Sequence, residues 1–383
     1  MSLRIAGMGW VTPLGSGLDH VWGRLLNGEM AKAESISSPL GRTHSVFRVP
    51  AEATAQAPAH PRLRRSSAIS RFAVVAGLAA LEDAKLKLDA ETPARTALIF
   101  AVSNGGVIYT KKFYHEIVES GARAASPLLF PETVFNAPAS HLAAILGISG
   151  ASYTLVGDGA VGILALKMAE DLMLNETFDH CLVVGAEESD WLLCDAYRRW
   201  RLLRSEPPIE PFQQPPRGMI LSEGAGAVLL QSEGRASARP GRSEDRPSGC
   251  SVYVEKIAGG TNFRRQREAG AAVDKVFSEL AGETDLVVAS ANGTFVDEGE
   301  RTAVLRHCRN AMVYAMKRFL GESVGASSLW QTICGVQSLR TQLVPPIEIE
   351  LSAKPKGPKQ VRRAVISVCG LNQQVAGLRL VRN

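Results

Sequence analysis

The chain has 383 residues, of which 45% are hydrophobic and 21% charged, a composition typical of a globular protein with a large buried core. It contains no run of eighteen apolar residues, so we expect no membrane-spanning helix. The net charge of +5 is too small and too scattered to indicate a nucleic-acid partner, but it would suit an acidic protein partner.

The first half of the chain alternates between strand and helix patterns. The N-terminus has no basic region followed by an apolar stretch, so residues 3–7 predict a buried strand entering a turn and not a signal peptide. Apolar residues spaced for one helical face predict a helix over 19–27, and Gly28 follows as a stop. A strongly apolar helix is expected over 70–86, with Ser70 as its cap. Further strands are expected at 96–102, 152–156 and 181–186, and a helix at 160–174.

A polar segment at 232–249, rich in Arg, Ser, Gly and Pro, has no apolar periodicity. It predicts a mobile surface loop that divides the chain into an N-terminal half, 1–231, and a C-terminal half, 250–383. The second half repeats the alternation, with buried strands expected at 285–291 and 364–368 and a long helix at 326–343. Strands that are apolar on both faces and alternate with helices indicate a covered α/β sheet.

The cysteines form no C-x-x-C pair, and no histidine cluster accompanies them. We therefore expect reduced thiols in a cytoplasmic protein, with no disulfide framework, no metal and no cofactor. The cysteines are Cys181, Cys194, Cys250, Cys308, Cys334 and Cys369.

Short motifs along nearly the whole chain resemble those of the elongating β-ketoacyl synthases, in that family's order. They lie at residues 4–17, 22–29, 70–73, 126–139, 222–227, 292–294, 317–326 and 369–371. The resemblance implies a thiolase-like five-layer αβαβα fold of two similar halves, each with a mixed sheet. It also implies a dimer whose contact is the strand at 152–156, and substrates carried on acyl carrier protein.

The positions where this family keeps its catalytic residues hold different chemistry. The family's nucleophile is a cysteine on a tight turn before a buried helix, where the helix N-terminus makes its thiolate reactive. The matching stretch, 156–162, preserves the turn but has Gly159 in the nucleophile's place. The two imidazoles that stabilise the enolate in relatives correspond to Asn292 and Glu322. The resemblance therefore implies that no catalytic triad is present.

Some neighbouring residues could form a residual site. Lys317 matches the family's motif lysine, and it could form an ion pair with Glu322 inside the vacated site, because a buried carboxylate needs a partner. Asp158 is expected to cap the following helix; the alternative is a nucleophile or base. Asp297 and Glu300 match acidic positions of the family.

The family's oxyanion hole corresponds to the backbone N–H groups of Gly159 and Leu371. Leu371 replaces a phenylalanine that gates the acyl tunnel in relatives, and Asn372 and Gln373 replace the glycines that follow it. These substitutions predict a stiffer loop. For Gly159 itself the simplest interpretation is a glycine at a tight turn, with no further function.

Other candidates have plainer interpretations. His141 is expected to be a hydrogen-bonded helix residue, and Cys369, after a buried strand, a packed and inert thiol. Two basic clusters are expected to be solvated faces, and either could dock an acidic carrier protein. They consist of Arg62, Arg64 and Arg65, and of Arg198, Arg199, Arg201 and Arg204.

Two functions from different classes follow. The first is a catalytically deficient subunit similar to a chain-length factor, which pairs with an active ketosynthase (or with itself) in fatty acid or polyketide biosynthesis, polyenes included. The familiar chain-length factors carry glutamine at the nucleophile position, whereas this chain has Gly159. The second is an active acyltransferase or hydrolase with a re-invented site around Asp158, Asn292 and Glu322.

Overall fold

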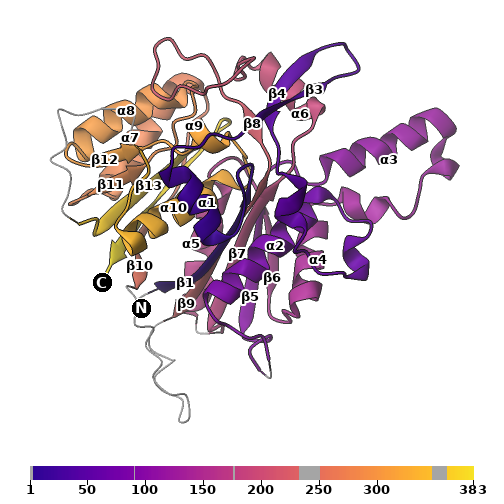
Figure 1. Cartoon of the computed structure of the whole chain (residues 1–383), viewed down its shortest axis with the longest axis horizontal. Coiled ribbons are helices and arrows are strands. Elements are labelled where there is room, and N and C mark those ends of the chain that lie inside the picture. The colour runs from indigo at the N-terminus through magenta and orange to yellow at the C-terminus, as the bar shows by residue number, and fades with distance from the viewer. Residues whose placement is uncertain (1–2, 90, 176, 233–250, 347–359) are drawn as a thin grey trace.

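The computed structural model describes residues 3–89, 91–175, 177–232, 251–346 and 360–383. The polar loop expected at 232–249 lies outside these ranges, apart from Ser232 at the end of a strand. Figure 1 shows strands at the centre of the molecule with helices on both sides.

The N-terminal half contributes one mixed set of strands, in the order β6-β5-β7-β9-β1. Strand β5 runs parallel to β6 and β7, whereas β9 runs antiparallel to β7 and β1. The bounds are β1 Leu3–Thr12, β5 Thr96–Val102, β6 Ser152–Val156, β7 His180–Glu187 and β9 Gly224–Ser232.

The C-terminal half repeats this arrangement, with the order β12-β11-β13-β14-β10. Strand β11 runs parallel to β12 and β13, and β14 runs antiparallel to β13 and β10. If the five strands of each half are numbered in chain order, both halves have the spatial order 3-2-4-5-1 with the same strand directions. The fold is therefore a structural duplication. The bounds are β10 Val252–Asn262, β11 Leu286–Val288, β12 Met312–Tyr314, β13 Arg363–Cys369 and β14 Gln374–Arg382.

The two strand sets are joined where β1 pairs antiparallel with β10, at Leu3 with Val254 and Arg4 with Tyr253. Helices α2 (Ala68–Asp83) and α4 (Ala137–Leu146) pack on the N-terminal strands. Helices α7 (Ala269–Glu279) and α8 (Val296–His307) cover the outer side of the C-terminal half. Helices α5 (Val161–Leu174) and α10 (Ser327–Thr341) contact each other and strands of both halves. The result is the expected αβαβα layering.

The remaining elements lie around these layers. Helix α3 projects from the body in Figure 1 and has no buried residue. The bounds are α1 Leu18–Leu26, α3 Val107–Ser120, α6 Trp191–Arg199 and α9 Lys317–Leu320, with short strands β2 Gly15–Ser16, β3 Ala33–Ser37, β4 Thr43–Phe47 and β8 Leu221–Ser222. The 3₁₀ turns are η1 Ala51–Thr54, η2 Pro61–Leu63, η3 Ala122–Ala124, η4 Phe130–Thr133 and η5 Gln266–Glu268.

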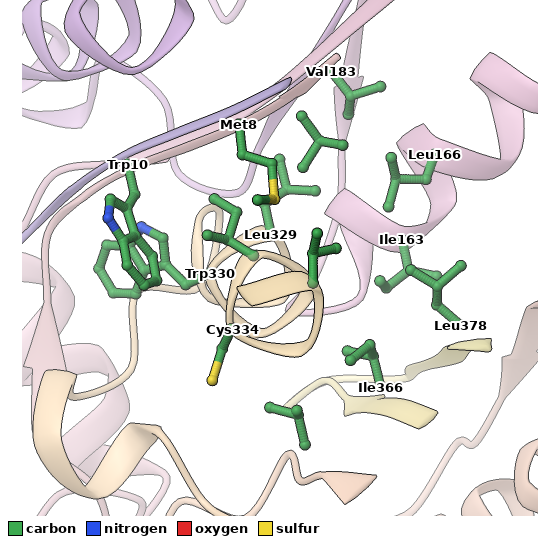
Figure 2. Close-up of a cluster of buried hydrophobic side chains, with 14 of the residues drawn as sticks. Met8, Trp10, Ile163, Leu166, Val183, Leu329, Trp330, Cys334, Ile366 and Leu378 are labelled. Atoms are coloured by element: carbon green, nitrogen blue, oxygen red, sulfur yellow. The ribbon is translucent and has the colours of Figure 1, made fainter. Parts of the chain in front are cut away.

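The core between the halves is organised around α10, which is buried on every side from Ser327 to Leu339. Figure 2 shows Met8 and Val183 from one half and Ile366 and Leu378 from the other around this helix and α5. Small residues bring the two central helices together. A Cβ added to Gly162 of α5 would lie 2.3 Å from the Ser328 Oγ of α10.

The predicted elements agree with the structure in kind and differ at their ends. Helix α2 begins earlier than expected, because Ser67 and not Ser70 occupies the N-cap position. Ser70 is buried within the first turn, where its hydroxyl lies 3.3 Å from that of Ser67. The strand expected at 285–291 is shorter in the structure, where β11 pairs with its neighbours only over Leu286–Val288. In the described ranges, no helix is long and apolar enough to cross a membrane.

Candidate functional site

Two connections meet the C-terminal loop at the centre of the molecule. One links β6 to α5 and contains Asp158 and Gly159; the other links β12 to α10 and contains Lys317 and Glu322. The loop between β13 and β14, residues 370–373, lies against the first connection, since Gly159 faces the Cα of Gly370. The fold therefore brings together segments more than two hundred residues apart.

Gly159 is buried, but its backbone does not require a glycine. Gly159 lies in a turn before α5, as expected, but its φ lies outside the left-handed region that favours glycine. A Cβ added there would lie 3.3 Å from the Cα of Gly370, and its next contacts would be at 4.0 Å. A small side chain would need only a slight shift of the neighbouring loop.

Asp158 does not cap α5, contrary to the expectation from its position. The N-cap position of α5 is Ala160, and no side chain caps it. The carboxylate instead accepts hydrogen bonds from three successive backbone N–H groups of the C-terminal loop. These come from Leu371 at 3.1 Å, Asn372 at 2.8 Å and Gln373 at 3.1 Å.

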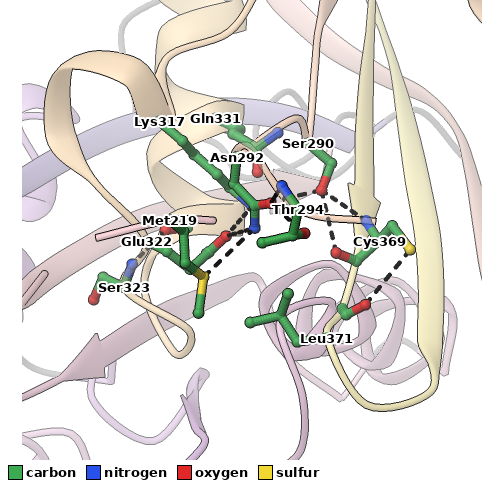
Figure 3. Close-up of polar contacts among 12 residues, drawn as sticks. Met219, Ser290, Asn292, Thr294, Lys317, Glu322, Ser323, Gln331, Cys369 and Leu371 are labelled. Atoms are coloured by element: carbon green, nitrogen blue, oxygen red, sulfur yellow. Dashed lines mark hydrogen bonds and ion pairs between the residues drawn. The ribbon is translucent and has the colours of Figure 1, made fainter. Parts of the chain in front are cut away.

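Lys317 and Glu322 form the predicted ion pair, with 2.7 Å between Nζ and Oε2. The same carboxylate oxygen accepts a hydrogen bond from Nδ2 of Asn292, also at 2.7 Å. Figure 3 shows the three side chains converging. All three are at most 2% exposed, so Lys317 is the cation that the buried Glu322 needs. The other carboxylate oxygen, Oε1 of Glu322, is buried and has no hydrogen-bond partner in the described residues.

The oxygen of the Asn292 side-chain amide is hydrogen-bonded as well. Its Oδ1 accepts hydrogen bonds from the hydroxyl of Thr294 at 2.6 Å and from that residue's N–H at 3.2 Å. Its backbone N–H donates to Asp297 at 2.9 Å. Asn292 is therefore held in one orientation, with its amide nitrogen pointing at Glu322.

Two further carboxylates lie beneath this network. Asp297 also accepts N–H donors from Phe212 and Gly293, and burial raises its pKa. Glu300 is fully buried and accepts the N–H of Ser290 at 2.7 Å; burial raises its pKa to about 7. Both match acidic positions singled out from the sequence, and both anchor backbone around Asn292.

Residues that the sequence did not single out connect these groups. The Ser290 hydroxyl lies 3.5 Å from the Lys317 Nζ and also bonds the backbone N–H and carbonyl of Cys369. Gln331 donates to the carbonyls of Ala289 and Ser367. No local pattern marks either one, because each joins strand ends that only the folded chain brings together.

Tyr197 is a third residue that no sequence pattern singled out. It is buried, and its pKa is raised, first by desolvation and then by the carboxylates of Glu187, Asp158 and Glu322. Its side chain is hydrogen-bonded to Asn104. Helix α6 thus places a phenol near both connections.

The other predicted residues take their simpler roles. His141, on α4, is hydrogen-bonded to Glu132 of η4, at 2.6 Å. Cys369 is buried, and desolvation raises the pKa of its thiol, which keeps the thiol protonated. The described cysteines are free and buried, and Cys250 lies outside the described residues.

The basic clusters are largely solvated, as expected. Arg62, Arg64 and Arg65 are exposed, as are Arg198, Arg199 and Arg201. Arg204 is less exposed and pairs with Glu210 at 3.5 Å. Exposed guanidinium groups on two faces are compatible with docking of an acidic protein.

The chemistry available at this site is limited. Gly159 supplies no nucleophile, and the Leu371 N–H, predicted to bind an oxyanion, already donates to Asp158. The acidic and basic groups of the second connection are paired with each other. In the part of the chain that the structure describes, no group of three or more His, Cys, Asp or Glu residues could hold a metal ion.

Comparison with known proteins gives the family. The model for the N-terminal domain of β-ketoacyl synthases matches residues 2–236. The chain is 23% identical to 3-oxoacyl-[acyl-carrier-protein] synthase 2 of Vibrio cholerae over 368 residues, 89% of this chain and 87% of that protein.

Solved structures agree on the fold. A structure described as the ishigamide ketosynthase/chain length factor superposes with a TM-score of 0.83 at 20% identity, covering 99% of this chain and 98% of that one. A ketosynthase in complex with its chain length factor from Xenorhabdus doucetiae gives 0.77 at 19% identity, covering 100% and 98%. The duplicated sheets, the order of motifs along the chain and these matches place the chain in the β-ketoacyl synthase family, with a thiolase-like fold.

Proposed function

We propose that this chain is a catalytically deficient β-ketoacyl synthase homologue that acts as a chain-length-factor-like subunit of a ketosynthase heterodimer, in fatty acid or polyketide biosynthesis. One observation carries the proposal. The positions expected to hold a cysteine and two imidazoles hold Gly159, Asn292 and Glu322, and the last two are bonded to each other and to Lys317. Gly159 has no side chain, and Asn292 and Lys317 bond Oε2 of Glu322, so these positions lack the thiol and the two imidazoles that condensation uses.

The outer edge of the N-terminal strands supports a role in pairing. Strand β6 ends the strand order, and on it Tyr153 is 40% and Val156 52% exposed. Helix α4 contacts both β6 and η4, and further large apolar side chains are exposed in and beside η4. These are Leu128, Phe130, Val134 and Phe135. Apolar surface next to an edge strand fits a stable protein interface.

The relatives supply the kind of assembly. Two solved structures of the same fold are described as a ketosynthase with a chain length factor, and the curated Vibrio cholerae relative is named for acyl carrier protein. We therefore propose an active ketosynthase as the partner of this chain, and acyl carrier protein as the donor that the pair receives. The exposed arginine clusters would suit that acidic donor.

The alternative, an acyltransferase or hydrolase built on Asp158, Asn292 and Glu322, has less support. The carboxylate of Asp158 faces backbone donors of the loop, and Glu322 faces Lys317 and Asn292. Both oxygens of Asp158 and Oε2 of Glu322 are thus directed at the protein's own donors. Tyr197 lies near both carboxylates but needs a basic partner to act.

The experiment compares the chain alone with the chain co-expressed with a ketosynthase from its own gene neighbourhood. Both are supplied with acylated carrier protein and malonyl carrier protein, and products are measured by mass spectrometry. We expect products only from the pair, and their loss when the partner's nucleophilic cysteine is changed to alanine.

Variants of this chain separate the two functions. D158N and E322Q in the pair, each checked for folding, should leave condensation in place. Turnover by the isolated chain would remove the proposed function. Loss of products in these folded variants, with the partner's cysteine intact, would favour the alternative. V156K on β6 should weaken co-purification of the pair, whereas E298Q on the exposed part of α8 should not.

A further inference from the structure

The C-terminal loop is bound to the first connection from both directions. While the carboxylate of Asp158 accepts three N–H groups of the loop, its own backbone N–H donates to the Oε1 of Gln374 at 3.0 Å. The N–H of Gly370 donates to the Gln374 carbonyl at 2.7 Å and closes the loop on itself. The two segments thus exchange hydrogen bonds across 216 positions of sequence.

We propose that Asp158 is a built-in latch: its carboxylate occupies the amide donors of residues 371–373 and holds this loop closed in the resting protein. Successive N–H groups that converge on one point form a concave anion site, and a carboxylate is a suitable occupant. Here the anion belongs to the chain itself. The donor expected to hold the oxygen of an acyl thioester is therefore already used; this last consequence rests on the proposed function.

The loop is shaped to receive this side chain. A Cβ added to Gly370 would lie 2.0 Å from Oδ2 of Asp158, so any other residue at that position would push the carboxylate out. A Cβ added to Gly157 would lie 2.9 Å from Oε1 of Gln374. Glycines on both segments allow the close approach that the hydrogen bonds need.

The ends of the loop are anchored as well. The Ser290 hydroxyl bonds the N–H and the carbonyl of Cys369 before the loop, and the N–H of Phe263 donates to the carbonyl of Gln373 within it, at 2.9 Å. Asn372 and Gln373 are nonetheless exposed to solvent. Their amides would exchange rapidly with water if the carboxylate did not hold them, which makes the latch measurable.

The test is hydrogen–deuterium exchange of the isolated full-length chain, resolved to residues 370–374. We expect the amides of 371–373 to be protected in the wild type. In D158A their exchange should rise by about tenfold or more, because local opening then sets the rate. D158N keeps one acceptor oxygen and should fall between the two. The control D171N changes an exposed aspartate at the other end of α5 and should alter nothing here.

Acetate and formate provide a chemical rescue. With the side chain of Asp158 removed, either anion can enter the vacated anion site formed by the N–H groups of 371–373. Adding acetate or formate to D158A should therefore restore protection of these amides. Chloride at equal ionic strength should not restore it. Fast exchange of these amides in the wild type would overturn the latch even if no variant folds. Unchanged exchange in folded D158A, or rescue by chloride alone, would overturn it too.

This outcome is independent of the heterodimer experiment. A chain without the latch could still form an active pair, which would leave the proposed function standing. If the exchange data showed the latch and the isolated chain turned over carrier-bound substrate, the latch would stand and the proposed function would fall.

Discussion

The two halves of the molecule have the same strand order, yet the connections after their third strands carry different chemistry. The first, between β6 and α5, is short and contains Gly157 and Gly159. The second, between β12 and α10, is longer, includes α9, and buries Lys317 and Glu322. Equivalent places in a duplicated fold thus provide backbone on one side and a buried ion pair on the other.

The difference shows that one fold can hold two kinds of contact at equivalent places. On the glycine side, backbone groups approach closely, and Asp158 supplies the only charge, which the C-terminal loop binds. On the charged side, each group depends on another for its stability. Substitutions should therefore have large effects in the second connection and small ones at Gly159.

The largest effect is expected for K317M. It leaves Glu322 as a buried charge without its cation, which should lower the free energy of unfolding by about 3–5 kcal/mol. Denaturant titration measures this. K167M removes a partly exposed lysine paired on α5, and should cost about 1 kcal/mol or less. The double variant K317M/E322L should recover much of the loss; failure to recover would mean that Lys317 contributes by packing and not by pairing.

The next effect distinguishes Gly159 in the first connection from Gly162 in the first turn of α5. In G162A the new methyl would overlap the Ser328 hydroxyl and crowd Leu329, so we expect a loss of about 1–3 kcal/mol from overpacking. In G159A the nearest atom is 3.3 Å away, and the loss should stay below about 1 kcal/mol. Thermal unfolding of both variants tests the ranking. Equal losses would show that Gly159 is needed for its backbone.

Titration of Glu300 is expected to have a smaller effect on the free energy of unfolding, for each pH unit. Burial raises its folded-state pKa to about 7 from the ordinary 4.5, so the folded protein binds the proton more tightly than the unfolded chain. The carboxyl therefore favours folding at low pH, and this contribution is lost as pH rises from 4.5 to 7. The stability of wild type relative to E300Q should fall by up to about 1.4 kcal/mol per pH unit in that window.

The control for this pH dependence lies on the same helix. Glu298 is exposed and two residues away, so E298Q should follow the wild-type profile. Denaturant titrations at several pH values measure the slopes. If the wild type and E300Q differed by a constant amount across the window, Glu300 would not be the group that titrates.

The sequence by itself was enough to predict most of the strands and helices, and to predict one contact at the site. Runs of apolar residues bounded by Gly and polar residues indicated β5, β6, α5 and α10, and their ends were predicted within a few residues. The ion pair of Lys317 with Glu322 was also predictable, because a carboxylate expected inside a protein needs a cation nearby.

Only the tertiary structure decided where Asp158 points. Local chemistry favours an aspartate before a helix as a cap, but a loop 213 positions away offers three N–H donors, and the carboxylate binds those. The roles of Ser290, Gln331 and Tyr197 were hidden for the same reason: their partners are contributed by strands and connections that pack together only once both halves have folded.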